Sequence, residues 1–207
     1  ILSGLVGSEM CIRDSCIIAL PHIGSWEWGG ALMAAIDYPM TAIAERIEPP
    51  ELFEWFVAKR EQMGLKIEGL DAQAGRKILS VLKDGGLVGL LCDRDIEGDG
   101  VEVTLLGERT TIPAGPATLA LRTGAALIPG TIYSGPGRDH SIVLAEPVET
   151  TRTDARLRED VARVSQDLAD QLSDLIRRAP EQWHVFSDPF ALHQERRSSA
   201  EQAPVPT

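Results

Sequence analysis

The sequence predicts an α/β fold with a mostly parallel central sheet flanked by helices. Short apolar runs rich in β-branched residues alternate with segments of helical periodicity from residue 16 to residue 148. Two of these runs, "CIIAL" (16–20) and "LVGLLC" (87–92), are apolar on both faces, as central strands of a parallel sheet are. A long amphipathic helix over about 154–178 follows the last strand.

The elements are expected in a regular order. The first strand leads into a helix over about 26–37, and the next strand spans 40–45. A helix over 49–64 has Pro50 in its first turn and Gly64 at its end. The sequence then predicts a strand at 65–70, a helix at 75–86, the strand at 87–92, an edge strand or hairpin arm at 101–107, a helix at 113–124, and antiparallel strands at 126–134 and 140–148.

The long helix carries one continuous apolar stripe. Its apolar residues recur at spacings of three and four, namely Leu157, Val161, Val164, Leu168, Leu172 and Leu175. The helix 49–64 is expected to bury Leu52, Phe53, Phe56 and Val57. The irregular segment "PEQWHVFSDPF" (180–190) after the long helix is expected to pack back on the domain.

One folded domain is expected over 16–192. The stretch "LSGLVGSEMCIRDS" resembles a translated sequencing-adapter string, so residues 1–15 are expected to be a non-native leader and the domain to be truncated at its amino terminus. A natural disordered leader is the alternative. The polar, proline-containing residues 193–207 are expected to form a disordered tail.

The composition excludes several classes of function. The formal net charge is −11, which argues against nucleic acid as a partner and against loose adhesion to anionic lipid. The three cysteines have no CxxC spacing, which indicates a reducing compartment. No apolar run reaches the ~18 residues of a membrane-spanning helix.

Polar residues end two of the buried strands. His22 follows the strand 16–20, and Asp93 follows the strand 87–92. Because ligands bind beyond the carboxyl ends of the strands in open α/β sheets, this edge is expected to bring His22 and Asp93 together. An imidazole held by a carboxylate can take a proton from a hydroxyl. The alternative is that both residues merely terminate strands.

Two further charged residues attract attention. Glu27 lies in the first turn of the second predicted element, where a carboxylate is favoured in any case. Arg60 continues the apolar stripe of the helix 49–64, so its guanidinium needs an acidic partner or an anionic ligand. Glu45, at the end of the second strand, is the expected partner, and a snorkelling Arg60 is the alternative.

Other chemistries have weak signals. The acidic segment "DRDIEGDG" (93–100) follows a strand and has Thr104 where an EF-hand needs a bidentate Glu, so it predicts a tight turn and no metal site. Cys92 lies in a buried strand beside acidic residues, which disfavours a thiolate nucleophile. His140 and His184 are expected to be structural.

The segment "LPHIGSWEWGG" resembles the HxxxxD/E motif of lysophospholipid-type acyltransferases, here in the form HxxxxE. The similarity is to the branch that holds the lipid A late acyltransferases and the phosphatidylinositol mannoside acyltransferases, and the segments "AER", "DRD" and "PAGPA" are closest to the mannoside branch. The similarity to this branch runs in order over roughly residues 16–190, and it implies the α/β fold of glycerolipid acyltransferases.

The resemblance implies an enzyme that moves an acyl group from acyl-CoA, as co-substrate, to a hydroxyl of a membrane glycolipid, with no cofactor. His22 would be the general base, and its acidic partner would be Asp93, where the mannoside branch has a Glu, or Glu27. Glu45, Arg46 and Arg60 would bind substrate. Arg94 is a further candidate for the donor phosphates or the oxyanion.

The family's place in the cell implies association with the cytoplasmic face of the inner membrane, peripherally or through a segment preceding this chain. The small residues of 114–126 would either leave room for an acyl chain or pack the core. Three other functions stay open: a lipid A-type acyltransferase that uses acyl carrier protein, a lipid-binding module without catalysis, and an esterase. The oligomeric state has no signal in the sequence.

Overall fold

The computed structural model describes residues 15–96, 98–137, 139–185 and 188–190. Within them, six strands form one sheet in the order β3-β2-β4-β1-β7-β8, and β5 and β6 form a separate hairpin. All neighbours in the six-stranded sheet are parallel except β7 and β8. The strands are β1 (Cys16–Leu20), β2 (Met40–Ala44), β3 (Lys66–Gly69), β4 (Leu87–Leu91), β5 (Val101–Leu105), β6 (Glu108–Ile112), β7 (Ala126–Ser134) and β8 (His140–Leu144).

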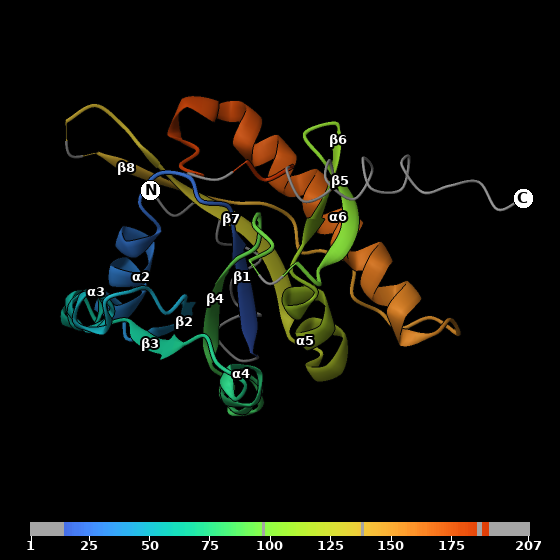
Figure 1. Cartoon of the computed structure of the whole chain (residues 1–207), viewed down its shortest axis with the longest axis horizontal. Helices are drawn as coiled ribbons and strands as arrows, with labels where there is room; N and C mark the ends of the chain where they lie inside the picture. The colour runs from blue at the N-terminus through green and yellow to red at the C-terminus, as the bar shows by residue number, and fades with distance from the viewer. Residues whose placement is uncertain (1–14, 97, 138, 186–187, 191–207) are drawn as a thin grey trace, which may run out of the picture.

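Helices flank the sheet, as the sequence predicted (Figure 1). The helices in the described residues are α2 (Trp26–Ala35), α3 (Pro50–Gln62), α4 (Ala74–Lys83), α5 (Gly115–Thr123), α6 (Leu157–Arg178) and the short 3-10 helix η2 (Pro180–Gln182). The α/β class and the mostly parallel sheet are therefore confirmed. The predicted leader lies outside the described residues except for Ser15, and the predicted tail lies entirely outside them.

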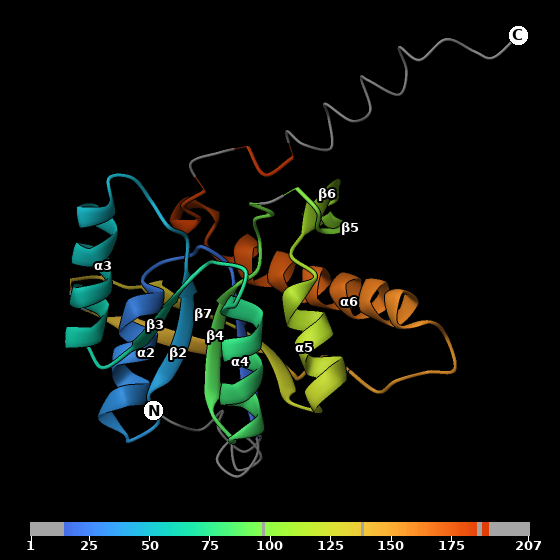
Figure 2. The same ribbon diagram turned by 60° about the horizontal axis from the view of Figure 1, so that its bottom comes forward.

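The main core lies between the sheet and the helices α4, α5 and α6 (Figure 2). Ile17 and Ala19 of β1 are fully buried there, opposite apolar side chains from all three helices. The predicted stripe of α6 is buried from Val161 onwards, while Leu157 is half-buried. The small residues of α5 pack this core, because Ala117 and Ala120 are buried.

Helix α2 lies over the opposite face of the sheet at very short range. A Cβ atom added to Gly29 would lie 2.7 Å from Cδ1 of Ile132, and one added to Gly30 would lie 2.6 Å from Cδ2 of Leu65. The glycine pair of "WEWGG" therefore lets α2 approach β7 and the start of β3, which holds the first turn of α2 close to the end of β1.

Helix α3 packs more loosely than the sequence predicted. The expectation that it buries its apolar stripe was wrong: Leu52 is 41% exposed, and Phe53, Phe56 and Val57 are only half-buried. The reason is the position of α3 beside the edge strand β3, where it has the sheet on one side only.

The structure shows the form of two segments that follow β4, the predicted strand or hairpin arm and the acidic turn before it. Residues 101–105 form an arm of the hairpin of β5 and β6, which is joined to α6 through hydrogen bonds between Thr104 and Gln166. The acidic segment after β4 forms a turn in which Asp95 accepts hydrogen bonds from the backbone N–H groups of Gly98 and Gly100.

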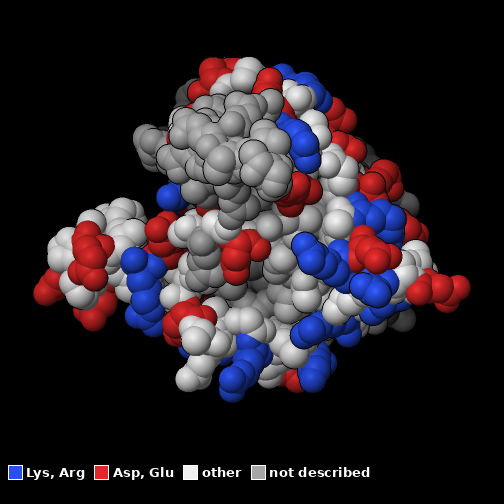
Figure 3. All heavy atoms as spheres, turned by 45° about the vertical axis from the view of Figure 1, so that its right-hand side comes forward, with Lys and Arg blue, Asp and Glu red and all other residues white. Residues whose placement is uncertain are grey.

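Charge is mixed over the surface drawn in Figure 3. Lys and Arg side chains gather in the lower half of that face, with Asp and Glu side chains beside and above them.

The loop between β1 and α2 depends on Gly24. This residue has a φ of 57°, and a Cβ atom would lie 1.9 Å from the carbonyl oxygen of Ile132. We expect Gly24→Ala to lower the free energy of unfolding by about 2–4 kcal/mol, measured by urea denaturation. Gly75→Ala is the matched control, because no atom lies within 4 Å of its added Cβ, and it should be neutral or slightly stabilising. Equal unfolding midpoints for the two variants would contradict this account of the loop.

Candidate active site

His22 and Asp93 lie against each other at the carboxyl ends of β1 and β4. The register of these parallel strands pairs Leu20 with Leu91. Two residues beyond this pair, His22 after β1 lies opposite Asp93 after β4. The distance between His22 Nδ1 and Asp93 Oδ1 is 2.6 Å. The backbone N–H of His22 also donates to Asp93 Oδ2 at 2.8 Å. The sheet thus joins two residues that are 71 positions apart in the sequence.

The two side chains differ in exposure. The Asp93 side chain is fully buried, while the His22 ring is 26% exposed. A carboxylate buried in this way must be compensated by donors. Because His22 Nδ1 faces the carboxylate, the neutral ring carries its proton there and leaves Nε2 as the acceptor. In this tautomer the contact with Asp93 occupies Nδ1, and Nε2 is the ring nitrogen able to accept a proton.

A third donor to Asp93 comes from Trp183. Its indole Nε1–H donates to Asp93 Oδ2 at 2.7 Å. Sequence reasoning missed this residue as part of the site. The available signal was the tryptophan in the irregular segment after α6, since an indole N–H that is partly buried usually finds an acceptor.

The segment 180–184 braces the loop that carries His22. The backbone N–H of His184 donates to the carbonyl of His22 at 2.7 Å, and the N–H of Gly24 donates to the carbonyl of Gln182 at 3.1 Å. Ile23 and Trp183 form an isolated antiparallel bridge. The expectation that this segment packs back on the domain is confirmed, and it packs directly on the site.

Glu27 contacts Arg60 and makes no hydrogen bond to His22 in the described part of the chain. Glu27 Oε1 lies 3.2 Å from Arg60 Nη2. Of the two candidate partners of His22, the geometry therefore selects Asp93. The expected pairing of Arg60 with Glu45 was wrong, because α3 lies beside α2 and Arg60 meets the first turn of α2 instead.

Arg60 is held between aromatic rings. Its Cζ atom lies 4.8 Å from the centroid of the Trp26 ring and 5.5 Å from that of Phe56. The side chain is only 20% exposed, and its Nε is buried without a hydrogen-bond partner among the described residues. The guanidinium thus keeps one donor unused beside the carboxylate of Glu27.

Two further arginines follow the ends of strands. Arg94 Nη1 lies 3.4 Å from Glu45 Oε2, and Arg46 Nη2 lies 3.4 Å from Asp71 Oδ2. Chiefly because the backbone N–H of Gln73 donates to it, the carboxyl of Asp71 has a pKa below its ordinary value. These side chains are substantially exposed, so each pair contributes little to stability and can exchange partners.

The remaining candidates have structural environments. His140 stacks on Trp28, with ring centroids 5.5 Å apart. Cys92 is fully buried, and burial, aided by the charge of Asp93, raises the pKa of its thiol far above the ordinary value. The interpretation that Cys92 is no nucleophile is therefore supported by its surroundings.

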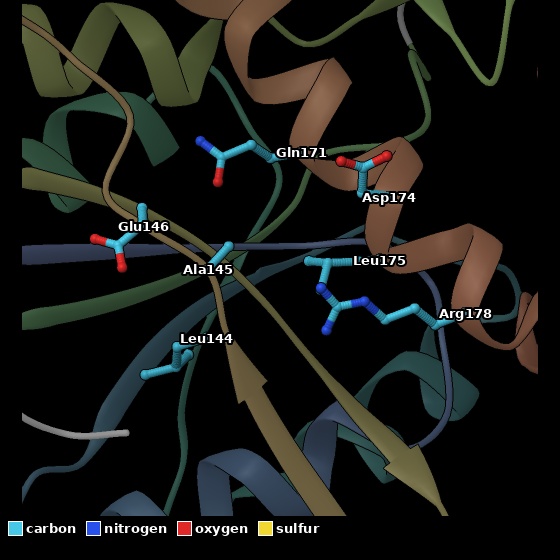
Figure 4. A pocket seen from close by; sticks show the side chains of 7 residues that line it. All are labelled: Leu144, Ala145, Glu146, Gln171, Asp174, Leu175 and Arg178. Carbon is cyan, nitrogen blue, oxygen red and sulfur yellow. The ribbon is translucent and has the colours of Figure 1, made fainter. Parts of the chain in front are cut away.

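A hollow of about 310 Å³ lies away from His22, between the end of β8 and helix α6 (Figure 4). Its lining consists of Leu144, Ala145, Glu146, Gln171, Asp174, Leu175 and Arg178. The Arg178 side chain extends from α6 towards β8. With two acids, an amide and an arginine in its wall, this hollow is unsuited to a fatty acyl chain.

A comparison with known protein families shows to which family the chain belongs. The family described as bacterial lipid A biosynthesis acyltransferase matches residues 11–191. The chain belongs to this family. The predicted resemblance to this group of acyltransferases is thereby confirmed, and the family consists of lipid acyltransferases.

The curated relatives within this acyltransferase family carry a narrower name. The chain is 33% identical over 173 residues to the phosphatidylinositol mannoside acyltransferase of Mycobacterium tuberculosis. The matched region covers 82% of this chain and 52% of that relative. It is 33% identical over 187 residues to the protein of the same name from Mycolicibacterium smegmatis, covering 88% and 59%. The chain thus spans little more than half the length of these relatives.

Cys92 is expected to resist alkylation in the folded protein. Burial and the neighbouring charge of Asp93 both oppose the thiolate, which is the reactive form. Labelling with iodoacetamide, read by peptide mass spectrometry, should be at least ~100-fold slower in native buffer than in concentrated urea. Equal labelling in the two conditions would show that the thiol is accessible and would contradict its burial.

Proposed function

We propose that the protein is an O-acyltransferase that moves a fatty acyl group from acyl-CoA to a hydroxyl of a membrane glycolipid, with a phosphatidylinositol mannoside as acceptor. The observation that carries this proposal is the 2.6 Å contact between His22 Nδ1 and the buried Asp93, in an imidazole whose side chain is 26% exposed. The name of the relatives supports the acceptor.

His22 acts as the general base in this proposal. The acceptor hydroxyl gives its proton to Nε2 as its oxygen attacks the thioester carbonyl of acyl-CoA, and the negative charge of Asp93 stabilises the imidazolium that forms. The tetrahedral intermediate then expels the thiolate of CoA, which takes the proton from His22. The reaction forms one ester, breaks one thioester, and needs neither a metal nor a covalent enzyme intermediate.

Arginines near the strand ends bind the anionic parts of the substrates. Arg46 and Arg94 are exposed, and their carboxylate partners lie at 3.4 Å, so phosphates can compete for them. Arg94 follows Asp93 directly and is the better candidate for the oxyanion. Glu45 pairs with Arg94 in the absence of substrate, and a phosphate would compete with it for the guanidinium.

Glu27 and Arg60 form the second part of the substrate site. The Arg60 and Glu27 side chains are 20% and 30% exposed, and the guanidinium lies beside the rings of Trp26 and Phe56. That combination suits the hydroxyl groups and the phosphate of a glycolipid headgroup, with Glu27 as an acceptor and Arg60 as a donor.

The acyl groups and the membrane require an apolar surface. Trp28 and Leu32 of α2 are 54% and 45% exposed, and Ile142 and Leu144 of β8 are 42% and 40% exposed. Since Trp28 stacks on His140, these two elements are adjacent, and α2 begins at Trp26, shortly after His22. This supports peripheral association with the cytoplasmic face of the inner membrane.

The described part of the chain contains no helix with both the length and the hydropathy needed to span a bilayer.

The description of the family favours a second candidate, a lipid A acyltransferase that uses acyl carrier protein. Such a donor is acidic and needs a basic docking surface. The net charge of the chain is −11, which favours acyl-CoA as the donor. An assay that offers both donors distinguishes the two enzymes.

Replacement of His22 tests the proposal directly. Purified protein is expected to transfer radiolabelled acyl groups from acyl-CoA to phosphatidylinositol mannoside in mixed micelles. His22→Ala should lower kcat by about 10²–10⁴-fold without unfolding the domain, because it removes the base. Asp93→Asn, which keeps the shape of the carboxylate but not its charge, should lower kcat by about 10²-fold or more.

The control is Gln62→Ala, at the exposed end of α3, which should keep the rate of the unaltered protein. A folded His22→Ala variant that transfers acyl groups at the normal rate would contradict the assignment of His22 as the base. Binding of acyl chains by the unaltered protein without transfer from either donor would instead identify a lipid-binding module.

A further inference from the structure

We infer that Trp183 is a positioning residue for acyl transfer, because its indole N–H fixes the Asp93 carboxylate in the orientation that presents Oδ1 to His22. This inference rests on the proposed function. The indole N–H of Trp183 donates to Asp93 Oδ2, so in this inference Trp183 acts through Asp93.

The two oxygens of Asp93 have separate tasks. Oδ2 accepts from the indole of Trp183 at 2.7 Å and from the backbone N–H of His22 at 2.8 Å. Oδ1 lies 2.6 Å from Nδ1 of the imidazole. With both of its donors in place, Oδ2 cannot turn towards the ring. Removal of the indole N–H leaves a buried carboxylate with one donor fewer and frees its rotation about Cβ–Cγ.

The position of Trp183 is itself fixed by its neighbours. The side-chain amide of Gln182 accepts from the N–H of Ser134 at 2.7 Å and donates to the carbonyl of Ser134 at 3.0 Å. On the other side, the backbone N–H of His184 donates to the carbonyl of His22. One short segment after α6 therefore aligns the end of β7, the backbone of His22 and the side chain of Asp93.

Packing alone is the competing explanation for Trp183. The side chain is half-buried and lies against the core, so a smaller residue would disturb the fold as well as the hydrogen bond. The decisive substitution must keep the shape of the indole and remove only its N–H. β-(3-Benzothienyl)alanine does this, since sulfur replaces the N–H in a ring system of the same size.

The test is site-specific incorporation of β-(3-benzothienyl)alanine at position 183 in the full chain. The same substitution at Trp55 is the matched control, because that side chain is 53% exposed on α3. At position 183 we expect kcat to fall about tenfold, with the KM for acyl-CoA and the urea midpoint unchanged. At position 55 all three quantities should stay as in the unmodified protein.

A spectroscopic measurement reports on the same contact without turnover. The proton between His22 Nδ1 and Asp93 Oδ1 is expected as a far-downfield proton resonance, because the two atoms are 2.6 Å apart. Incorporation at position 183 should shift this resonance, and incorporation at position 55 should not.

An unchanged kcat and an unshifted resonance at position 183 would overturn the inference. So would a fall in kcat accompanied by an equal rise in KM and a lowered urea midpoint, since that pattern indicates packing. Failure of the unmodified protein to transfer acyl groups from any donor would contradict the proposed function instead, and the resonance would still report whether Trp183 holds Asp93.

Discussion

The buried carboxylate of Asp93 is the constraint on which the site depends. A carboxylate without solvent is costly to bury, and here donors from two separate parts of the chain meet it. Two of these donors belong to His22, and the third belongs to Trp183. Strands β1 and β4 and the segment after α6 must therefore come together for the charge to be tolerated, and the same contacts orient the imidazole.

The other charged pairs of the site are built differently. Arg94 with Glu45 and Arg46 with Asp71 are exposed and lie at longer distances than the contact of His22 with Asp93. Water and salt weaken such pairs, so they are adjustable in a way that the buried carboxylate is not. In the proposed reaction, the fixed contact of His22 with Asp93 serves proton transfer, and the exposed arginine pairs can exchange partners with phosphates of the substrates.

The sequence predicted the parts of the site that follow from the sheet. Two strands that are apolar on both faces are central and parallel, so the residues that follow them share an edge, and this is why His22 and Asp93 were identified together. The partner of Arg60 was not predictable in this way. It depends on how α3 lies against α2, which local periodicity does not encode.

Trp183 was missed for a related reason. It lies beyond the long helix, 90 positions from Asp93, in a segment without periodicity, so no pattern links it to the strand ends. The apolar stripe of α3 was overestimated because periodicity reports which side of a helix is apolar and not how much of that side the fold covers. The elements themselves were predictable because each buried strand and the stripe of α6 has a strong local signature.

The central claim is that His22 and Asp93 work as one unit, and a double-mutant cycle on the acyl-transfer rate tests it most directly. Asp93→Asn and His22→Ala are measured singly and together under identical conditions. If the carboxylate acts only through the imidazole, Asp93→Asn will slow the unaltered protein strongly but cause no further loss once His22 is alanine. An equal loss from Asp93→Asn in both backgrounds would contradict the account, because the two residues would then act independently.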